Sequence, residues 1–277
     1  MSEAPATTAG RGPVARFLAM PNDDPVKTVL VALILCLVCA VAVSVAAVML
    51  RPLQERNKDL AFKREIVNVA GLYTPGGDIQ ALFNQVDARM VDLASGEYRP
   101  DLDPESYTPQ TAARNPETGT AIAPSKDLAH IKRRSRFVPV YLVRHDHKLR
   151  LIILPVYGTG LWSTMYGLLA LHADANTVAG VSFYEQAETA GLGAEITDPR
   201  WQAEWTGKRI YDGAGQVRFH LAKGGAAGDA AAAAYEVDAV SGATLTSNGV
   251  TDLVHYWLGD DGFGRFLARL KQQEGSG

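Results

Sequence analysis

An uninterrupted apolar run near the start of the chain restricts the fold more than any other feature. Residues 29–50, VLVALILCLVCAVAVSVAAVML, contain no charged residue, and Ser44 is the only polar one. At about 1.5 Å of rise per residue, a helix of this length crosses a hydrocarbon core of about 30 Å. The alternatives are a cleaved signal peptide and a buried core helix. We predict a retained transmembrane helix over 25–51, because the run exceeds a signal peptide's apolar region and no small-residue cleavage site clearly follows.

The charges beside this span do not decide its orientation. Basic residues flank it on both sides: Arg11, Arg16 and Lys27 before it, and Arg51, Arg56, Lys58, Lys63 and Arg64 after it. Read alone, the positive-inside rule favours a cytoplasmic C-terminus, but large domains are translocated largely regardless of charge. Residues 1–24 are small and polar, and we predict a disordered tail there.

The two cysteines lie inside the apolar run. Cys36 and Cys39 are three residues apart, on one helix face, and could form half of a metal or cluster site shared with another protein of a complex. Two thiolates leave a tetrahedral site incomplete, so we interpret both as small apolar residues in lipid. No grouping of His, Asp and Glu has ligand spacing either, and we predict no protein-bound metal. The net charge of −3 and the lack of a basic stripe argue against a nucleic-acid partner.

The first half of the remaining chain reads as helix followed by irregular structure. Apolar spacing predicts a helix over 53–72 that Gly71 terminates and that continues the membrane helix outward after Pro52. A second amphipathic helix is predicted over 79–93, opened by Asp78. Residues 99–126 are rich in Pro, Thr, Asn and Asp without periodicity, which predicts a long surface insertion.

From residue 137 onward the pattern changes to strands. Three hairpins are predicted, with arms at 137–144 and 148–157, at 168–173 and 177–185, and at 216–223 and 235–241. The arm 148–157 is nearly all apolar and is therefore expected to be central. The Ala/Gly tract 224–234 predicts a flexible loop, and 198–208 and 245–272 are expected to be helical, the latter broken near Gly259–Gly262. The sum is an α+β domain: an antiparallel sheet with flanking helices, held on one N-terminal transmembrane helix.

The stretch VDAVSGATLTSNGV, residues 237–250, concentrates hydroxyl side chains on a turn that leads into a helix. In the simplest interpretation Gly242 permits the turn, and Thr246 or Ser247 caps the helix. In a second interpretation the N–H groups of the helix start, together with the helix dipole, hold a phosphate close to the Thr hydroxyls. A phosphate esterified to a Thr here would carry one negative charge, which suits such a position.

The segment Asp238-x-x-Ser241-Gly242-Ala243-Thr244 resembles the flavinylation motif of FMN-binding domains in Na⁺-translocating NADH:quinone oxidoreductases and related Rnf-type complexes. The resemblance implies that Thr244 carries FMN as a phosphoester. It also implies a separate flavin transferase, which donates the FMN group from FAD. Ser241, Gly242, Ala243 and Thr246 would shape the turn and offer donors to the phosphate.

Two further stretches extend the resemblance over residues 25–271. GTGLWSTMYGLLAL, residues 158–171, is similar to the G-x-G-L-W-x-x-M-x-G segment of the NqrC family, the flavin-carrying subunits of the Na⁺-translocating enzyme. ETAGLGAEI, residues 188–196, is similar to the family's E-T-P-G-L-G loop, with Ala190 in place of Pro and Gln186 where His is frequent. The resemblance implies flavin contacts from Trp162, Ser163, Thr164, Glu188, Thr189, Gly191, Leu192 and Gly193.

The function implied is that of an electron-carrying subunit of a membrane Na⁺-translocating NADH:quinone oxidoreductase. The resemblance also implies that residues 52–277 form a periplasmic FMN-binding domain anchored in the bacterial inner membrane. Other subunits of the complex would be its partners. No catalytic residue is expected, since the chain has no dinucleotide-binding or hydrolase motif and no intramembrane charge. The alternatives are the equivalent subunit of an Rnf-type ferredoxin:NAD⁺ complex and, from another class, a membrane-anchored assembly or sensor module without flavin.

Overall fold

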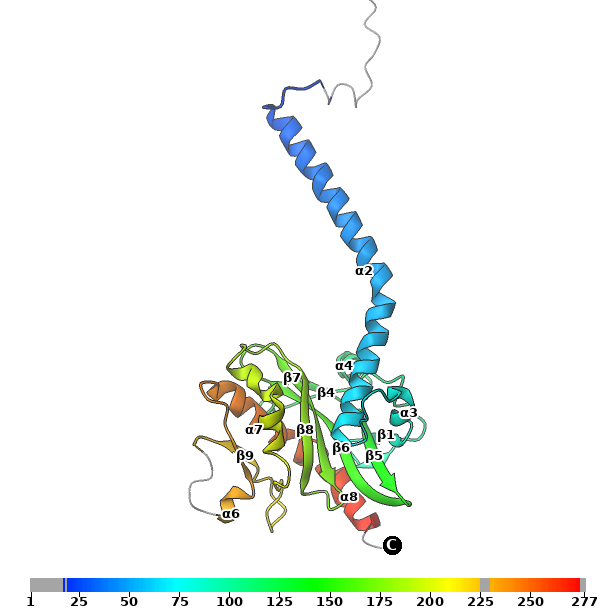
Figure 1. Ribbon diagram of the computed structural model, residues 1–277, viewed down its shortest axis with the longest axis vertical. Coiled ribbons are helices and arrows are strands. Elements are labelled where there is room, and N and C mark those ends of the chain that lie inside the picture. Colours follow the sequence, from blue (N-terminus) through cyan, green and yellow to red (C-terminus); the bar gives the residue numbers. More distant parts are fainter. Residues whose placement is uncertain (1–16, 18, 225–229, 275–277) are drawn as a thin grey trace, which may run out of the picture. The chain divides into compact units, whose positions relative to one another are not determined.

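The computed structural model describes residues 17, 19–224 and 230–274 (Figure 1). The chain divides into two compact units, one up to Asp59 and the other from Leu60. Most of the predicted tail 1–24 and the part 225–229 of the Ala/Gly tract lie outside the described residues. Ala230–Ala233, at the end of that tract, form a short helix, α6.

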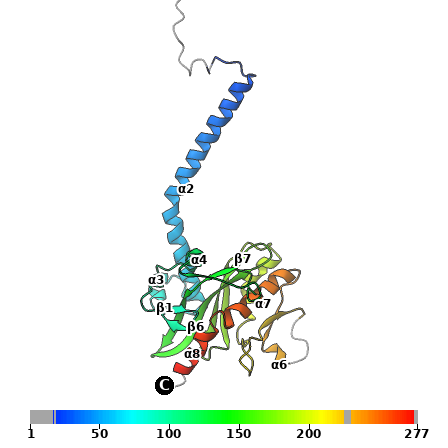
Figure 2. The same ribbon diagram turned by 180° about the vertical axis from the view of Figure 1, so that it is seen from behind.

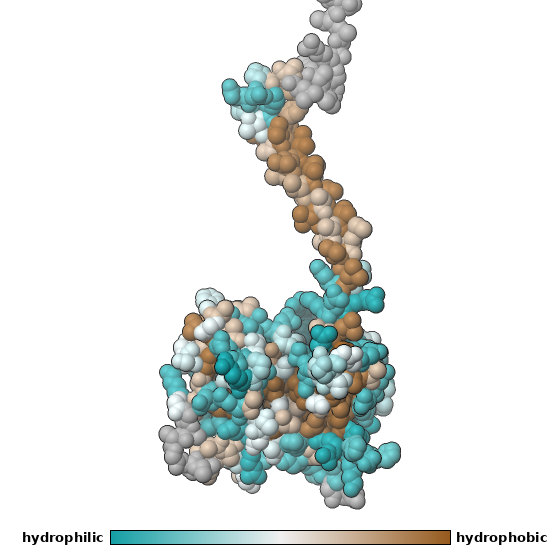
Figure 3. Space-filling model, viewed as in Figure 1, coloured by the Kyte–Doolittle hydropathy of each residue, from teal (hydrophilic) through white to brown (hydrophobic). Residues whose placement is uncertain are grey.

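One long helix, α2, spans Pro25–Val69 and contains Pro52 without interruption. Its apolar run shows in Figure 3 as a stretch of brown and pale-brown surface. Among the described residues α2 is the one helix long and apolar enough to cross a membrane. It ends as predicted: Gly71 has a φ of 68°, and the N–H of Leu72 donates to the carbonyl of Val67 at 3.0 Å. A left-handed glycine with this bond is a common helix ending.

The second unit is built on a six-stranded antiparallel sheet with the order β2-β1-β5-β6-β7-β8. Its strands are β1 Val86–Asp92, β2 Glu97–Tyr98, β5 Phe137–His145, β6 Lys148–Thr159, β7 Thr164–His172 and β8 Val178–Glu185. The first two predicted hairpins are confirmed as β5–β6 and β7–β8. β6 lies inside the sheet and is buried on both faces, as its nearly continuous apolar sequence predicts.

Two hydrophobic clusters cover the two faces of this sheet. Because successive side chains of a strand alternate, Leu142 and Ile152 enter one cluster while their neighbours Tyr141 and Ile153 enter the other. Helices α7, Thr244–Leu258, and α8, Gly264–Glu274, pack on the first face (Figure 2). The last turns of α2 and the short helix α3, Ile79–Phe83, pack on the second.

The predicted helix over 79–93 is wrong beyond its first turn. Asp78 does cap α3, accepting the N–H of Gln80 at 2.9 Å, but the chain becomes strand β1 at Val86. β1 pairs with β5 from Val86↔Val143 to Asp92↔Phe137. The spacing of the apolar residues in this segment fits a strand as well as a helix. Pairing with a strand about fifty residues away decides in favour of the strand.

The third predicted hairpin is also wrong. β9, His220–Ala222, and β10, Glu236–Asp238, pair in parallel, with Val237 opposite Leu221. Parallel neighbours cannot be joined by a tight hairpin turn, and α6 lies in the sequence between these two strands. This pair lies directly before the hydroxyl-rich turn and sets the direction from which the chain enters α7.

Short elements occupy the remaining segments. The predicted insertion 99–126 contains α4, Pro109–Arg114, and β3, Gly119–Ala121, which pairs with β4, Arg133–Ser135. The predicted helix over 198–208 is limited to α5, Pro199–Ala203, preceded by the 3₁₀ turn η1, Gly193–Thr197.

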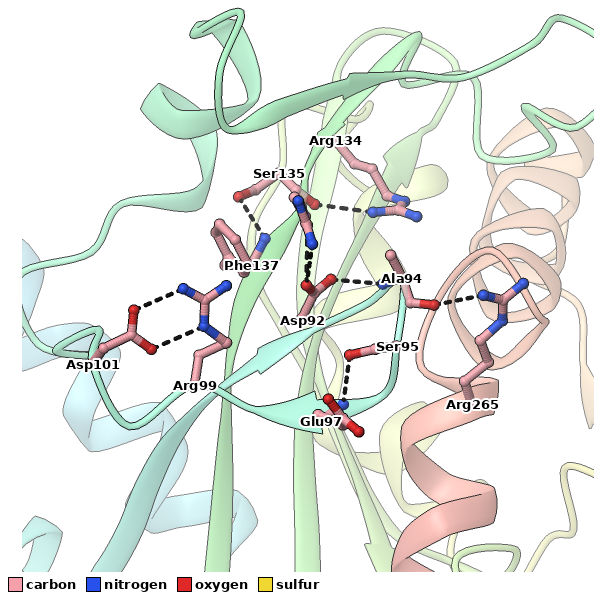
Figure 4. A network of polar contacts seen from close by, with 11 residues as sticks. Asp92, Ala94, Ser95, Glu97, Arg99, Asp101, Arg134, Ser135, Phe137 and Arg265 are labelled. Atoms are coloured by element: carbon pink, nitrogen blue, oxygen red, sulfur yellow. Dashed lines mark hydrogen bonds and ion pairs between the residues drawn. The ribbon is translucent and has the colours of Figure 1, made fainter.

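A polar network closes the β1–β2 end of the sheet (Figure 4). Buried Asp92 accepts the N–H of Ala94 at 2.9 Å and the guanidinium of Arg136 at 2.7 Å. Burial alone raises the pKa of Asp92, but these donors outweigh it and hold the pKa below its usual value. The network fixes the β1–β2 turn, and we assign it a structural role.

Candidate functional site

The SGAT turn connects β10 to α7 and needs glycine at its second position. Gly242 has a φ of 74°, a conformation that residues with a Cβ rarely adopt. A Cβ at this position would also lie 2.9 Å from Cδ2 of Leu192. The turn therefore brings residues 241–244 against the segment 188–193, although about fifty residues separate the two segments in the sequence.

The hydroxyls after the turn do not cap the helix, which corrects the simplest interpretation of the sequence. Thr246 is 1% exposed and its Oγ1 donates to Oε2 of Glu188 at 2.6 Å. Oγ of Ser247, also buried, accepts the N–H of Val240 at 3.1 Å. Thr246 and Ser247 therefore tie α7 to the preceding turn and to the 188–193 segment, rather than offering a hydroxyl donor to a ligand.

The start of α7 is consequently open. Ala243 occupies the N-cap position, and among the described residues no side chain accepts a hydrogen bond from the first-turn N–H groups. These N–H groups have no partner within the helix, and the helix dipole adds partial positive charge there. Thr244, the first residue of α7, is exposed, as are Ser241 and Leu245. An exposed hydroxyl thus stands at a position that favours an anion.

Glu188 joins the two loops that surround this turn. Glu188 is 8% exposed as a residue, and its carboxylate accepts the N–H groups of Leu161, Trp162 and Ser163 at 3.1, 3.0 and 3.3 Å, in addition to the Thr246 hydroxyl. Burial raises the pKa of Glu188, but the four donors outweigh it, and the net pKa lies below the ordinary 4.5. The ionised carboxylate therefore contributes stability that is present above the unfolded-state pKa and is lost as the pH falls through the lowered folded-state pKa.

The 160–163 loop carries the most exposed aromatic residue near the turn. Trp162 is 70% exposed, and its indole N–H donates to Oγ1 of Thr189 at 3.1 Å. Oγ of Ser163 accepts the N–H of Ala187 at 2.8 Å, which ties the loop to the segment before Glu188. Large apolar side chains stand exposed on the segments that meet here: Leu161, Trp162, Leu192 and Leu245. They offer a surface against which a planar apolar group can pack.

The structure brings most of the predicted site residues into one connected group, through the contacts described above between the turn, the 188–193 segment and the 160–163 loop. Thr164 begins β7 opposite Thr159, and Gly191, with a φ of 71°, shapes the loop. Sequence reasoning missed the role of Gln186, whose Oε1 accepts the N–H of Glu188 at 2.5 Å.

Sequence reasoning also missed the need for glycine where α7 crosses β6. A Cβ on Gly249 would lie 2.5 Å from the carbonyl oxygen of Thr159 and 3.2 Å from Cε of Met165. A Cβ on Gly158 would lie 2.7 Å from Cβ of Leu253. Both glycines let α7 lie close to β6, and the Gly158-x-Gly160 pattern that carried the resemblance was the available signal.

We expect Gly249→Ala to destabilise the domain by about 1–3 kcal/mol, because the new methyl group meets a backbone carbonyl that cannot rotate away. Helix propensity alone would favour alanine by about 1 kcal/mol. Urea unfolding of the detergent-solubilised chain followed by circular dichroism measures the difference. Gly180→Ala is the matched control, since the space around Gly180 is open. Equal urea midpoints for Gly249→Ala and Gly180→Ala would contradict the inference that Gly249 is needed for the close packing of α7 on β6.

Two grooves in the second unit lie away from the turn. One, of about 550 Å³, is lined by residues of α2, β8 and α5, including Glu65, Ser182 and Gln202. The other, of about 450 Å³, is lined by residues including Tyr211, Asp260 and Lys271. Neither is lined by residues of the SGAT turn.

Comparisons with known proteins identify the family of this chain. Residues 160–259 match the FMN-binding domain family, a range that holds the 160–163 loop, Glu188 and the SGAT turn. The C subunit of the Na⁺-translocating NADH-quinone reductase of Pseudomonas aeruginosa is 47% identical over 257 residues, covering 91% of this chain and 98% of its own length. The chain belongs to the NqrC family of Na⁺-translocating NADH-quinone reductases.

Other members of the NqrC family extend the comparison. The Pasteurella multocida protein is 42% identical over 256 residues, covering 90% of this chain and 96% of its own. The crystal structure of Shewanella oneidensis NqrC superposes with a TM-score of 0.72 at 36% identity, covering 78% of this chain and 99% of that one. The predicted fold class and family are thereby confirmed. The one membrane-spanning candidate among the described residues, together with membership of this family, fits a protein that crosses the membrane once.

Proposed function

We propose that this chain is the flavin-carrying subunit of a Na⁺-translocating NADH:quinone oxidoreductase and holds FMN as a phosphoester on Thr244. One observation carries the proposal: an exposed Thr hydroxyl in an SGAT turn stands at the open start of a fifteen-residue helix. Membership of the NqrC family and the FMN-binding domain match over 160–259 support it.

The residues present fit both ends of the cofactor. A phosphodiester carries one negative charge, which the first-turn N–H groups and the dipole of α7 favour. Ser241 is exposed and close enough in sequence to offer a further hydroxyl donor. The exposed side chains of Trp162, Leu192 and Leu245 would supply apolar cover for a flat ring system. The neighbouring segments that support them contain Ser163, Thr164, Thr189, Gly191 and Gly193.

Attachment makes Thr244 a substrate of a separate flavin transferase. The Thr244 hydroxyl oxygen would form the new bond to phosphorus, the pyrophosphate bond of FAD would break, AMP would leave, and the hydroxyl proton would be lost. Thr246 and Ser247 are buried with their hydroxyls engaged, so Thr244 is the accessible threonine of the turn. When bound, FMN would supply one-electron redox chemistry between the centres of other subunits. The chain's own contribution is to bind, orient and shield it.

The apolar run within α2 would anchor the chain over 25–51 in the bacterial inner membrane, with residues 1–24 cytoplasmic and 52–277 periplasmic. A covalent bond suits a cofactor on an exported domain, because a dissociable flavin would be lost by dilution. The other membrane subunits of the complex would supply NADH oxidation, quinone reduction and Na⁺ passage.

The test is to express the chain in cells with and without the flavin transferase and to separate the membranes by denaturing electrophoresis. We expect flavin fluorescence on the band only when the transferase is present, and an FMN mass increment on the peptide containing residues 241–247. A dark band despite active transferase would favour an assembly or sensor module. Fluorescence together with co-purification of Rnf-type partners would instead identify the equivalent Rnf subunit.

A further inference from the structure

The Glu188 carboxylate is the point where three segments of the site meet. It binds the 160–163 loop through three backbone N–H groups and α7 through the Thr246 hydroxyl, while belonging itself to the 188–193 segment. We infer that Glu188 is a positioning residue that locks the Trp162 loop to the first turn of α7, so that the site around Thr244 is shaped before FMN is attached. This inference rests on the proposed function.

The hydrogen bonds of the carboxylate leave it little capacity to contact a ligand. Oε2 accepts Leu161 N–H and the Thr246 hydroxyl, and Oε1 accepts the N–H groups of Trp162 and Ser163. An ionised carboxylate has about four acceptor sites, so all are in use. Glu188 is also almost fully buried. Glu188 was expected to contact the flavin directly. We infer instead that it acts indirectly, by holding the loop that carries Trp162.

Two glycines of the surrounding motifs are explained by the same carboxylate. A Cβ on Gly193 would lie 2.5 Å from Oγ1 of Thr246 and 3.0 Å from Oε2 of Glu188. A Cβ on Gly160 would lie 2.6 Å from Oε1 of Glu188. Both would enter the space that the hydrogen bonds occupy, so the GTGLW and ETAGLG stretches form one interlocking unit around Glu188.

A short chain of hydrogen bonds through Glu188 connects Trp162 to the helix turn that contains Thr244. Trp162 is held twice, by its backbone N–H on Glu188 and by its indole N–H on the adjacent Thr189. Thr246, bound to the same carboxylate, lies two residues after Thr244 in the first turn of α7. Losing the carboxylate would release the loop from the helix while leaving Thr244 itself intact.

The first experiment uses the full chain in detergent without transferase, and so does not depend on flavin. Hydrogen exchange is compared at the N–H groups of Leu161, Trp162 and Ser163 in wild type and in Glu188→Ala. We expect exchange to rise by about tenfold or more when the charged acceptor is removed. Glu195→Gln, which changes an exposed carboxylate on the neighbouring turn, is the matched control and is expected to leave the rates unchanged. Unchanged rates in Glu188→Ala would overturn the inference.

The second experiment uses transferase-treated chains and reads the visible circular dichroism and midpoint potential of the attached flavin. We expect Glu188→Gln and Thr246→Val to change the circular dichroism and the midpoint potential of the flavin in the same direction as each other. Thr246→Ser keeps the hydroxyl and is expected to give the wild-type values. If Glu188→Ala does not fold, these milder variants still test the positioning role. A flavin signature identical to wild type in Glu188→Gln and Thr246→Val would overturn the positioning role. Absence of flavin in wild type would contradict the proposed function instead, and the exchange rates would still decide the Glu188 lock.

Discussion

Replacing Thr244 with alanine is expected to reduce the covalent flavin of the chain to background. The variant lacks the oxygen that would form the ester, and the neighbouring Thr246 and Ser247 cannot substitute for it because they are buried and hydrogen-bonded. Thr244 is exposed, so we expect the free energy of unfolding to change by no more than about 0.5 kcal/mol. In-gel fluorescence after transferase treatment measures the loss, and circular dichroism establishes that the fold is retained.

Two further variants make this result specific. Thr244→Ser retains a hydroxyl and is expected to retain a fluorescent band. Thr206→Ala removes an exposed threonine elsewhere in the same unit and is expected to behave as wild type. Full fluorescence in Thr244→Ala would move the attachment to another hydroxyl, of which exposed Ser241 would be examined first.

Truncating Trp257 is expected to produce the largest loss of stability. Trp257 is 0% exposed on α7, packs against Tyr157, Tyr256 and Phe263, and donates its indole N–H to the carbonyl of Tyr157 at 2.6 Å. Trp257→Ala leaves a cavity and removes the hydrogen bond to the Tyr157 carbonyl, and large aromatic truncations cost about 3–5 kcal/mol. Because Trp257 anchors the helix that begins at Thr244, we expect reduced flavin attachment as well. Urea unfolding and in-gel fluorescence measure the two effects.

Trp162→Ala is the matched control for this loss, since it removes the same side chain from a position that is 70% exposed. We expect it to lower the free energy of unfolding by at most about 1 kcal/mol while changing the environment of the attached flavin. A second variant, Trp257→Phe, separates the hydrogen bond to Tyr157 from the ring packing. Equal stability losses in Trp257→Ala and Trp162→Ala would contradict the assigned core position of Trp257.

The strands that could be predicted are those whose pairing partner is adjacent in the sequence. The β5–β6 hairpin was predictable because its arms are apolar and its turn is polar, and the turn residues Asp146 and His147 have φ values of 51° and 62°. The segment around Met90 was mispredicted because its apolar spacing fits a helix as well as a strand. Only its pairing with β5 decides between them, and single-segment periodicity contains no information about a distant partner.

The same limit explains the errors near the site. The parallel pairing of β9 and β10 places two strands side by side in the same direction, and the composition of the Ala/Gly tract between them does not indicate that direction. Thr246 and Ser247 resembled caps because caps are defined by local spacing. Their actual partners, Glu188 for Thr246 and Val240 for Ser247, include one that is 58 residues away.

By itself, the sequence determined the apolar helix, the α+β class, the family and the candidate attachment residue Thr244. Each depends on a run or a short motif whose residues are neighbours along the chain. The tertiary structure decided that Thr244 is exposed while Thr246 is buried, that α7 begins uncapped, and that Glu188 joins three segments. These properties depend on groups far apart in sequence being brought within hydrogen-bonding distance, which only the packing of α7 against the sheet can do.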